Sequence, residues 1–313
     1  MKYKKIDGRF IMSQQRGEAS FGEVMKWQMS GARQKWPAHI ENKTYPAPPI
    51  RVEGRDLAVT WIGQATVLLQ TAGLNILTDP FFSKRASPSQ WFGPARVRDP
   101  GIARENLPPI DLILLSHNHY DHLDKPALQA LARSHDVKII TPLNNGRHFT
   151  APDVQEMDWY QSIEHAGVVI TALPALHWSK RSLRDTNKSL WAAFAIEGPM
   201  GLIYFGADTG YGDGETFRDA RQRLGAPRLS LLPIGAYEPR WFMAPQHMNP
   251  QEAVQAHIDL ESQTSLAIHH GTVQLTDEAI DAPVKALDEA LAASNLNPTA
   301  FLAPDVGNTV WIE

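Results

Sequence analysis

The chain has 313 residues, of which 43% are apolar and 20% are charged, a composition typical of a globular protein with a sizeable core. Its formal net charge of −4 is spread along the sequence without a basic run, so nucleic acid is not an expected partner. It contains no cysteine, which excludes a disulfide scaffold, a cysteine zinc finger and a thiol nucleophile. A bound metal would therefore need His, Asp or Glu ligands.

Residues 1–50 are expected to form an arm packed on a domain at 51–313. The arm contains Trp27 and Trp36, and buried aromatic side chains commonly anchor such segments, although a lipid or partner contact is the alternative. Its basic start is followed by polar residues from Asp7 onward, not by the apolar region of a signal peptide. No stretch approaches the ~20 apolar residues of a membrane span. We expect a cytoplasmic protein, with peripheral contact at a membrane surface left open.

From residue 57 the sequence changes to short apolar runs separated by turns, the pattern of strands. Helical patterns alternate with strands after residue 125, which predicts an α/β fold of two sheets covered outside by helices. The expected strands are 57–62, 66–70, 74–77, 111–115, 137–140, 168–173, 190–196, 202–205, 229–232, 265–268 and 310–312. The expected helices are 125–134, 214–224, 250–260 and 284–293.

The loop after the apolar strand at 111–115 carries the most informative motif. It reads Ser116-His117-Asn118-His119-Tyr120-Asp121-His122-Leu123-Asp124 and holds four potential metal ligands within six residues. Imidazole nitrogen and carboxylate oxygen suit zinc and similar ions. A loop can turn its side chains to different sides, so His117 and His119 can meet one ion, while Asp121 and His122 meet a neighbouring one. Chance histidines in a polar loop are a poor alternative at this spacing.

One loop cannot complete two coordination spheres, so further ligands must come from other strand ends. His177, Asp208 and His269 each follow an expected strand, and strand ends at one sheet edge converge. Taken singly, each has a structural alternative, because lone histidines are often structural and an Asp before Thr-Gly is often a turn residue. His270 competes with His269 for the last ligand position. With the loop, they predict two divalent ions, zinc by default, although manganese and iron use similar ligands.

These residues resemble the metallo-β-lactamase superfamily, whose core is an αββα sandwich with a dinuclear metal site. Longer strings resemble the N-acylphosphatidylethanolamine-hydrolysing phospholipase D family, over most of the chain from about Trp61 to about Leu291. The strings are LTDP at 77–80, RASPSQ at 85–90, the motif loop at 116–124, HWSKR at 177–181 and GAYEPRWFM at 235–243. The resemblance implies a metal-dependent phosphodiesterase that acts on N-acylphosphatidylethanolamine or a related glycerophospholipid.

The same resemblance implies a role for each ligand. It places His117, His119 and His177 on one metal, Asp121, His122 and His269 on the other, and Asp208 between them. Asp79 matches an acidic residue that could orient a ligand histidine, although an Asp before Pro80 can also be a turn residue. Two positions depart from the family pattern. Gln64 stands where many relatives carry His and is not an expected ligand, and His270 stands where the phospholipase often has Trp.

Two residues outside the ligand set are candidates for the chemistry. Divalent ions held by only two carboxylates keep positive charge, which favours an anionic phosphodiester and attack on phosphorus by metal-activated water. His247 could protonate the leaving alkoxide or cap the next helix. Tyr120 could contact the phosphate or pack beside it; Tyr237 and Arg181 are weaker candidates.

Several aromatic and methionine side chains around the phospholipase-like strings could line an acyl-chain groove, or pack in the core. They are Trp91, Phe92, Trp178, Trp241, Phe242 and Met243. A lactonase or other carboxylic ester hydrolase on the same fold is the first functional alternative, because fold-level similarity does not determine the reaction. A metal- or lipid-binding protein without turnover is the second, and the complete ligand set argues against it.

Overall fold

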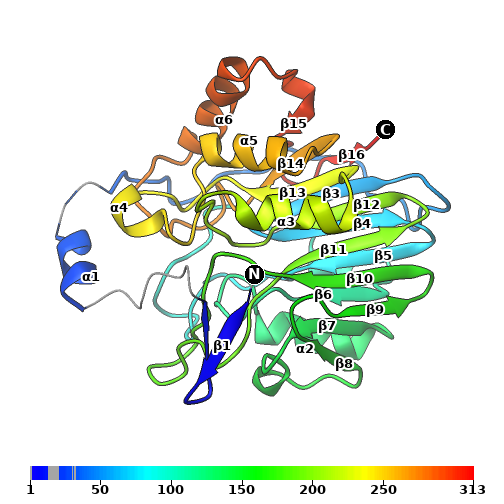
Figure 1. The fold of residues 1–313 in the computed structure, drawn as a ribbon, viewed down its shortest axis with the longest axis horizontal. Helices are drawn as coiled ribbons and strands as arrows, with labels where there is room; N and C mark the ends of the chain where they lie inside the picture. The colour runs from blue at the N-terminus through cyan, green and yellow to red at the C-terminus, as the bar shows by residue number, and fades with distance from the viewer. Residues whose placement is uncertain (1, 13–20, 30, 32) are drawn as a thin grey trace.

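The computed structural model describes residues 2–12, 21–29, 31 and 33–313, and two seven-stranded sheets form its body (Figure 1). The first sheet has the spatial order β16 (Thr309–Trp311), β3 (Ala58–Gly63), β4 (Thr66–Thr71), β5 (Leu74–Thr78), β6 (Leu112–Leu114), β7 (Lys138–Pro142) and β8 (Val154–Met157). The second has the order β15 (Phe301–Leu302), β14 (Thr264–Ile268), β13 (Leu229–Pro233), β12 (Gly201–Phe205), β11 (Ala193–Gly198), β10 (Val168–Leu173) and β9 (Ser162–His165).

Each sheet is half antiparallel and half parallel. In the first sheet the pairs from β16 to β5 are antiparallel and those from β5 to β8 are parallel. In the second sheet the pairs from β9 to β12 are antiparallel and those from β12 to β15 are parallel. As a result, the carboxyl ends of β5, β6, β10, β12, β13 and β14 can present loops along one side of the sandwich.

Helices cover the outer faces of the two sheets, as the sequence predicts. The helices are α1 (Phe21–Gln28), α2 (Lys125–Ser134), α3 (Glu215–Leu224), α4 (Arg240–Met243), α5 (Pro250–Asp259) and α6 (Ala282–Ala293), with short 3-10 helices η1 (Arg104–Asn106), η2 (Gly146–His148) and η3 (Pro298–Ala300). Helix α2 lies on the first sheet, whereas α3 and α5 lie over the second (Figure 1). The αββα sandwich is therefore confirmed.

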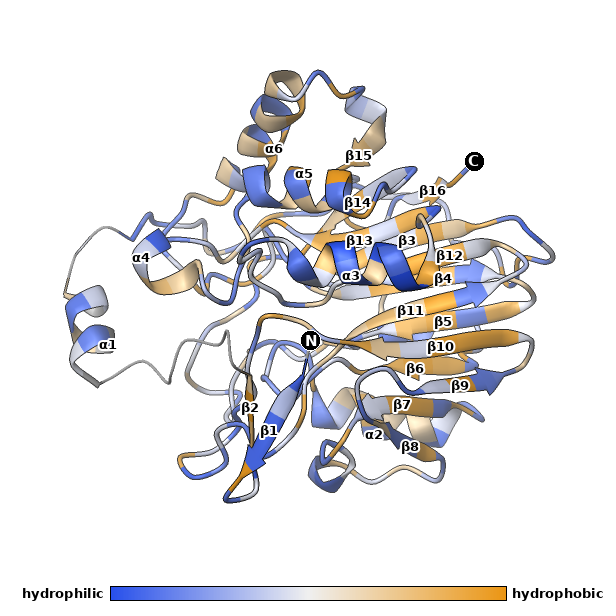
Figure 2. Ribbon diagram, viewed as in Figure 1, coloured by the Kyte–Doolittle hydropathy of each residue, from blue (hydrophilic) through white to orange (hydrophobic). Residues whose placement is uncertain are grey.

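The alternation of side chains along each strand separates two apolar cores. In β4, Leu69 belongs to the large core between the sheets, where it joins side chains of the second sheet such as Phe194 and Leu231. The neighbouring Leu68 points to the opposite face and joins the core beneath α2, with Leu128. Both faces of the strand are thus buried, which explains why three consecutive apolar residues, 67–69, occupy its centre. Figure 2 shows hydrophobic residues along the strands of both sheets.

The structure contains elements that the sequence pattern did not indicate. Hairpin β1–β2 (Tyr3–Ile6 and Arg9–Met12), the half-exposed edge strands β8 and β9, and the short helices α1 and α4 were not expected. The expected strand at 190–196 begins only at Ala193. The preceding segment is buried but bonds elsewhere, because the N–H of Leu190 donates to Leu143 O and that of Ala192 to Ser116 O.

The N-terminal arm makes long-range contacts with the rest of the chain. The Trp36 indole is buried and donates to Glu278 O at 2.8 Å. The Trp27 ring stacks on Phe242 with centroids 5.1 Å apart, and its N–H donates to Asp277 Oδ2 at 2.8 Å. These contacts support the proposal that 1–50 is an arm of the domain at 51–313. Among the helices that the structure describes, none has the length and apolar character needed to cross a membrane.

Candidate metal centre

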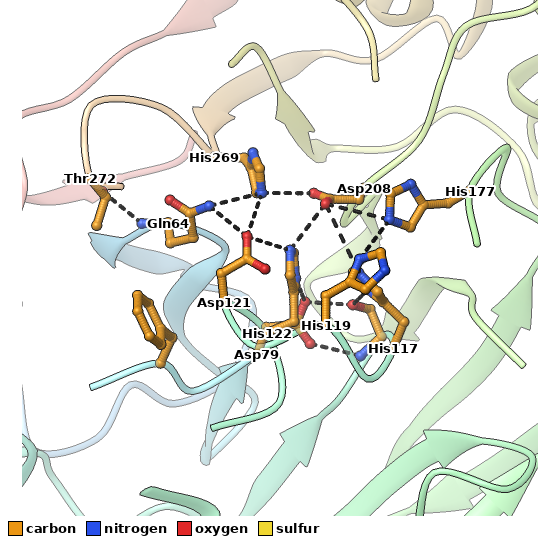
Figure 3. A network of polar contacts seen from close by, with 12 residues as sticks. Gln64, Asp79, His117, His119, Asp121, His122, His177, Asp208, His269 and Thr272 are labelled. Carbon is orange, nitrogen blue, oxygen red and sulfur yellow. Dashed lines mark hydrogen bonds and ion pairs between the residues drawn. The ribbon is translucent and has the colours of Figure 1, made fainter. Parts of the chain in front are cut away.

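The loops at the carboxyl ends of several strands bring seven His and Asp side chains together (Figure 3). The motif loop follows β6, His177 follows β10, Asp208 follows β12, and His269 follows β14 directly. The first sheet supplies the motif loop and the second supplies the other three residues. The site therefore lies where the two sheets meet at one edge of the sandwich.

Hydrogen bonds at the start, in the middle and at the end of the motif loop fix its conformation. At its start, the backbone N–H of Ser116 donates to Asp79 Oδ1 at 2.7 Å. In its middle, the N–H groups of His122 and Leu123 both donate to His119 O, which forms a tight turn. At its end, Asp124 caps helix α2 by accepting from the N–H of Ala127. The ligand-type residues thus sit between two anchored positions.

Three groups of side chains in the described residues could hold an ion, and the smallest is Asp79 with His117 and His122. The first of the two four-residue groups contains three histidines and one carboxylate: His117, His119, His177 and Asp208. His119 Nδ1 lies 2.8 Å from His117 Nε2 and 3.2 Å from His177 Nε2. Asp208 Oδ2 lies 4.0 Å from His117 Nε2 and 3.7 Å from His177 Nε2. Lone pairs of neutral imidazoles that face one another at this range repel unless a proton or a cation lies between them.

The second group contains two histidines and two carboxylates: Asp121, His122, Asp208 and His269. Asp121 Oδ2 lies 3.1 Å from His269 Nε2 and 3.4 Å from His122 Nε2. Asp208 belongs to both groups: its Oδ2 lies 3.1 Å from His122 Nε2, while its Oδ1 lies 3.2 Å from His269 Nε2. Its carboxylate is therefore placed to bridge two ions.

The donor set fits two divalent transition-metal ions. Within each group the ligand atoms all lie within 4.8 Å of one another, and nearly all of these side chains are buried. His122 Nε2 and Asp208 Oδ1 are buried and make no well-aligned hydrogen bond among the described residues; their polar neighbours are other ligand-type atoms, as expected of atoms that face a metal. Imidazole nitrogen with carboxylate oxygen is the ligand chemistry of zinc, manganese and iron sites.

Protonation in the metal-free protein follows from burial and mutual charge. Burial lowers the pKa of His119 to about 3 and that of His177 to about 4, so both rings are neutral, the form that binds metal. Burial also disfavours charge on Asp208, but the neighbouring imidazoles of His122 and His269 outweigh it and hold the Asp208 pKa well below its ordinary value. Burial opposes a proton on His122, yet Asp208, Asp121 and Asp79 raise its pKa. Metal binding would displace such a proton.

Asp79 lies behind the ligands, fully buried. Its carboxylate accepts from the Ser116 N–H at 2.7 Å and the Ser116 Oγ–H at 2.6 Å, and it lies 2.7 Å from His122 Nδ1. A proton on Nδ1 that is donated to Asp79 leaves Nε2 of His122 directed at Asp208. This geometry suits a carboxylate that sets the tautomer of a ligand histidine, the role expected from the sequence.

His247 is buried next to the two groups. Its ring centroid lies 5.2 Å from that of His177 and 5.7 Å from that of His269, and its Nδ1 has no hydrogen-bond partner in the described part of the chain. The helix-capping role that was its alternative belongs to Asn249, which forms a reciprocal capping box with Glu252 at the start of α5. The structure therefore favours His247 as a residue of the site.

Tyr120 lies in the wall of the same cleft as His119 and Asp121, and its hydroxyl is hydrogen-bonded within the protein. Its hydroxyl donates to the backbone carbonyl of Arg181 at 2.8 Å, and the Arg181 guanidinium lies over its ring at 4.1 Å. Arg181 in turn donates to the carbonyls of Asn118 and Leu123 in the motif loop. The packing interpretation of Tyr120 is favoured, because its hydroxyl hydrogen is already committed.

A cleft of about 680 Å³ opens beside the metal centre and includes His119 and Asp121 in its wall. Trp178, Leu183 and Leu275 give it apolar surface. Lys180 and Arg181 add cationic side chains to the same wall. A ligand with both an anionic group and an apolar chain would match this lining.

His269 and His270 are separated as their order along the chain suggests. His269 Nε2 faces Asp121 and Asp208, whereas the His270 ring stacks on Trp61 with centroids 4.4 Å apart and an interplanar angle of 25°. The positive φ of His269, 60°, turns the chain sharply between them. Only His269 is therefore placed to bind metal.

We expect protein loaded with metal to contain about two ions per chain, because seven ligands exceed what one tetrahedral ion needs. His269→Ala should lose at least one ion and abolish hydrolysis of a chromogenic phosphodiester. His270→Ala should keep both ions and lose about 1 kcal/mol of stability with the Trp61 contact. Elemental analysis, an activity assay and thermal unfolding of both variants test this. The reverse pattern would move the ligand by one residue.

Gln64 lies closer to the ligand-type residues than the sequence indicated. It was not expected among the ligands, yet its side-chain nitrogen lies 2.9 Å from Asp121 Oδ2 and 2.9 Å from His269 Nε2. A glutamine directly after Trp61-Ile62-Gly63, at the end of a fully buried strand, was the signal that could have indicated a buried amide there.

The sandwich and its buried His/Asp groups define a metal-dependent hydrolase. Residues 74–270 match the family model described as "Beta-lactamase superfamily domain". The chain belongs to the metallo-β-lactamase superfamily. Among solved structures, the metallo-beta-lactamase fold protein YhfI from Bacillus subtilis aligns with a TM-score of 0.56 and 18% identity, over 82% of this chain and 99% of that one.

Two curated relatives share more sequence identity with the chain than this solved structure does. The chain is 38% identical to N-acyl-phosphatidylethanolamine-hydrolyzing phospholipase D 1 of Caenorhabditis elegans, over 82% of this chain and 75% of that protein. It is 35% identical to the mitochondrial N-acyl-phosphatidylethanolamine-hydrolyzing phospholipase D of Saccharomyces cerevisiae, over 80% of this chain and 55% of that protein. Both alignments cover most of the chain, as the strings in the sequence suggested.

Proposed function

We propose that this protein is a phosphodiesterase of the phospholipase D type, which cleaves N-acylphosphatidylethanolamine or a related glycerophospholipid. The observation that carries the proposal is the cleft beside the metal centre, whose wall combines His119 and Asp121 with apolar and cationic side chains. The similarity to two N-acyl-phosphatidylethanolamine-hydrolyzing enzymes supports the same substrate class. The products would be a phosphatidic acid and the free N-acylated amino alcohol.

The proposed ligands divide between two metal positions. His117, His119 and His177 would hold one ion, Asp121, His122 and His269 the other, and Asp208 would contact both. Bound divalent ions, zinc in our proposal, would polarise the phosphoryl group and activate water near neutral pH. Because Asp121 and Asp208 are the only carboxylates that the described residues contribute to these two groups, the site would keep net positive charge, which suits an anionic diester and its more highly charged transition state.

The chain's own residues would orient the ligands and move a proton. Asp79 would hold His122 through Nδ1, and Gln246 O, 3.0 Å from His177 Nδ1, would hold His177 in the same way. Burial lowers the pKa of His247 well below its ordinary value, so its ring is neutral. In our proposal this neutral ring takes up the proton released by the attacking water at its unpartnered Nδ1 and, as the imidazolium, gives a proton to the leaving alkoxide.

The apolar side chains in and near the phospholipase-like strings differ in exposure: some are on the surface, some line the cleft and some are buried. Trp91 and Leu183 are 91% and 95% exposed, and Phe92 is 66% exposed, so these three do not pack in the core. Leu183 also lines the cleft, and Trp178 contributes to its wall. The exposed apolar side chain of Leu183 at the cleft supports contact of the cleft with lipid, including peripheral contact with a membrane surface. Met243, by contrast, is buried.

The substrate class can be tested with a chain-length series of N-acylphosphatidylethanolamines in mixed micelles with added zinc. Each methylene buried in the cleft contributes roughly 0.8 kcal/mol, so kcat/KM should rise about fourfold per buried methylene until the cleft is filled. Mass spectrometry should detect phosphatidic acid, and chelator-treated protein is the control. Rapid opening of a lactone without phosphatidic acid from any chain length would replace this proposal by a lactonase on the same centre.

A further inference from the structure

Gln64 lies in the turn between β3 and β4, directly beside the metal centre. It is 1% exposed and has a φ of 54°, after Gly63 with a φ of 134°. Its backbone N–H donates to Thr272 Oγ1 at 3.0 Å, and its carbonyl accepts from the His269 N–H at 2.8 Å and the Trp61 Nε1–H at 2.9 Å. These hydrogen bonds tie the turn to the segment that carries His269, and they fix the backbone from which the Gln64 side chain extends.

The side-chain amide of Gln64 ends among the atoms of the second group. Its Nε2 donates to Asp121 Oδ2 at 2.9 Å and lies 2.9 Å from His269 Nε2 (Figure 3). Asp121 Oδ2 is also the oxygen that lies closest to the histidines of this group, at 3.1 Å from His269 Nε2. Gln64 thus touches the carboxylate oxygen that would face the second ion.

We propose that Gln64 is a positioning residue of the second metal position, which holds Asp121 in its ligating orientation. A hydrogen bond from an amide to an ionised carboxylate is charge-assisted and stronger than one between neutral groups. It restrains rotation of a carboxylate that would otherwise need ordering when the ion binds. Because the amide is uncharged, it orders Asp121 without adding to or cancelling the charge of the site.

The effect should be confined to one of the two positions. The hydrogen bonds of the Gln64 side chain fall on Asp121 and His269, both members of the second group, whereas the first group is built on His117, His119 and His177. Removing the amide should therefore weaken one site and spare the other. A general loss of stability would not produce this asymmetry.

The test is Gln64→Met, which keeps the length of the side chain and removes its polar end. The matched control is Gln70→Met: Gln70 is equally buried on the adjacent β4, donates to Pro49 O and Asn75 Oδ1, and lies outside both groups. Zinc titration against a chelator of known affinity would give two dissociation constants for each protein. We expect the second site of Gln64→Met to weaken about 10–100-fold, as for other residues that orient ligands, with the first site unchanged.

Several outcomes would overturn the inference. They are two unchanged sites in Gln64→Met, an equal weakening of both sites, or the same selective loss in Gln70→Met. Thermal unfolding of the metal-free proteins shows whether the variants are folded; if Gln64→Met is not, Gln64→Asn keeps the amide but shortens its reach and should show the same selective loss. The inference rests on the proposed binuclear centre and not on the lipid substrate. A protein that binds two zinc ions but cleaves no phospholipid would refute the proposed function and leave this inference intact.

Discussion

Asp208→Ala should reduce hydrolysis by on the order of 10³-fold or more and lower the metal content. Asp208 is shared by the two four-residue groups that could hold metal, and its oxygens face opposite ways, Oδ2 toward His122 and Oδ1 toward His269. Its loss removes an anionic ligand from both positions at once. Stabilisation of transition-state charge by bound metal is worth several kcal/mol, and about 1.4 kcal/mol corresponds to a tenfold change in rate.

The measurement combines kcat/KM on a chromogenic phosphodiester with elemental analysis of the same preparation. Asp208→Asn keeps the shape of the side chain and removes its charge, so it should also lose metal and activity. Asp288→Ala, on the exposed face of α6, is a control that should behave as the unaltered protein. If Asp208→Asn retained two ions and activity within tenfold of the original, Asp208 would not bridge them.

The second large effect is expected at Asp79, on stability as well as on metal binding. Its buried carboxylate accepts two hydrogen bonds from Ser116 and lies 2.7 Å from His122 Nδ1. Asp79→Ala leaves the Ser116 N–H and the His122 ring without a partner in a region closed to water. Breaking a buried charged contact on one side typically costs about 3–5 kcal/mol, and losing a residue that orients a ligand lowers metal affinity about 10–100-fold.

Denaturant unfolding of chelator-treated protein measures the first effect and zinc titration the second. Ser116→Ala is the graded comparison, because it removes the hydroxyl that donates to Asp79 and keeps the carboxylate; it should cost about 1–2 kcal/mol. An Asp79→Ala protein whose unfolding free energy stays within about 1 kcal/mol of the original, with unchanged zinc affinity, would reduce Asp79 to a turn residue.

Local pattern was enough to predict two sheets covered by helices and to single out the ligand-type residues of the motif loop, while the resemblance implied the αββα sandwich, which the structure confirms. The strands of the central region are buried on both faces, so they appear as short apolar runs, and the sequence predicted most of them within a few residues. Edge strands such as β8 and β9 are half-exposed and carry polar residues, so their pattern is weak and they were missed. A strand that is buried on both faces is therefore easier to predict from its sequence than a half-exposed strand at the edge of a sheet.

The ligand-type residues of the motif could be recognised because their spacing is local, but only the tertiary structure decided what surrounds them. His269 and His270 are neighbours in sequence, and the sharp turn at His269 sends one to the metal groups and the other onto Trp61. The sequence left His247 between a proton-transfer role and a helix cap, and the structure shows that Asn249 is the residue that caps α5. Gln64 contacts Asp121 and His269 across 57 and 205 residues of chain. The periodicity of apolar residues indicates which face of a strand or helix is buried. Contacts between distant loops depend on how the two sheets pack, and the packing of the sheets cannot be predicted from a local sequence pattern.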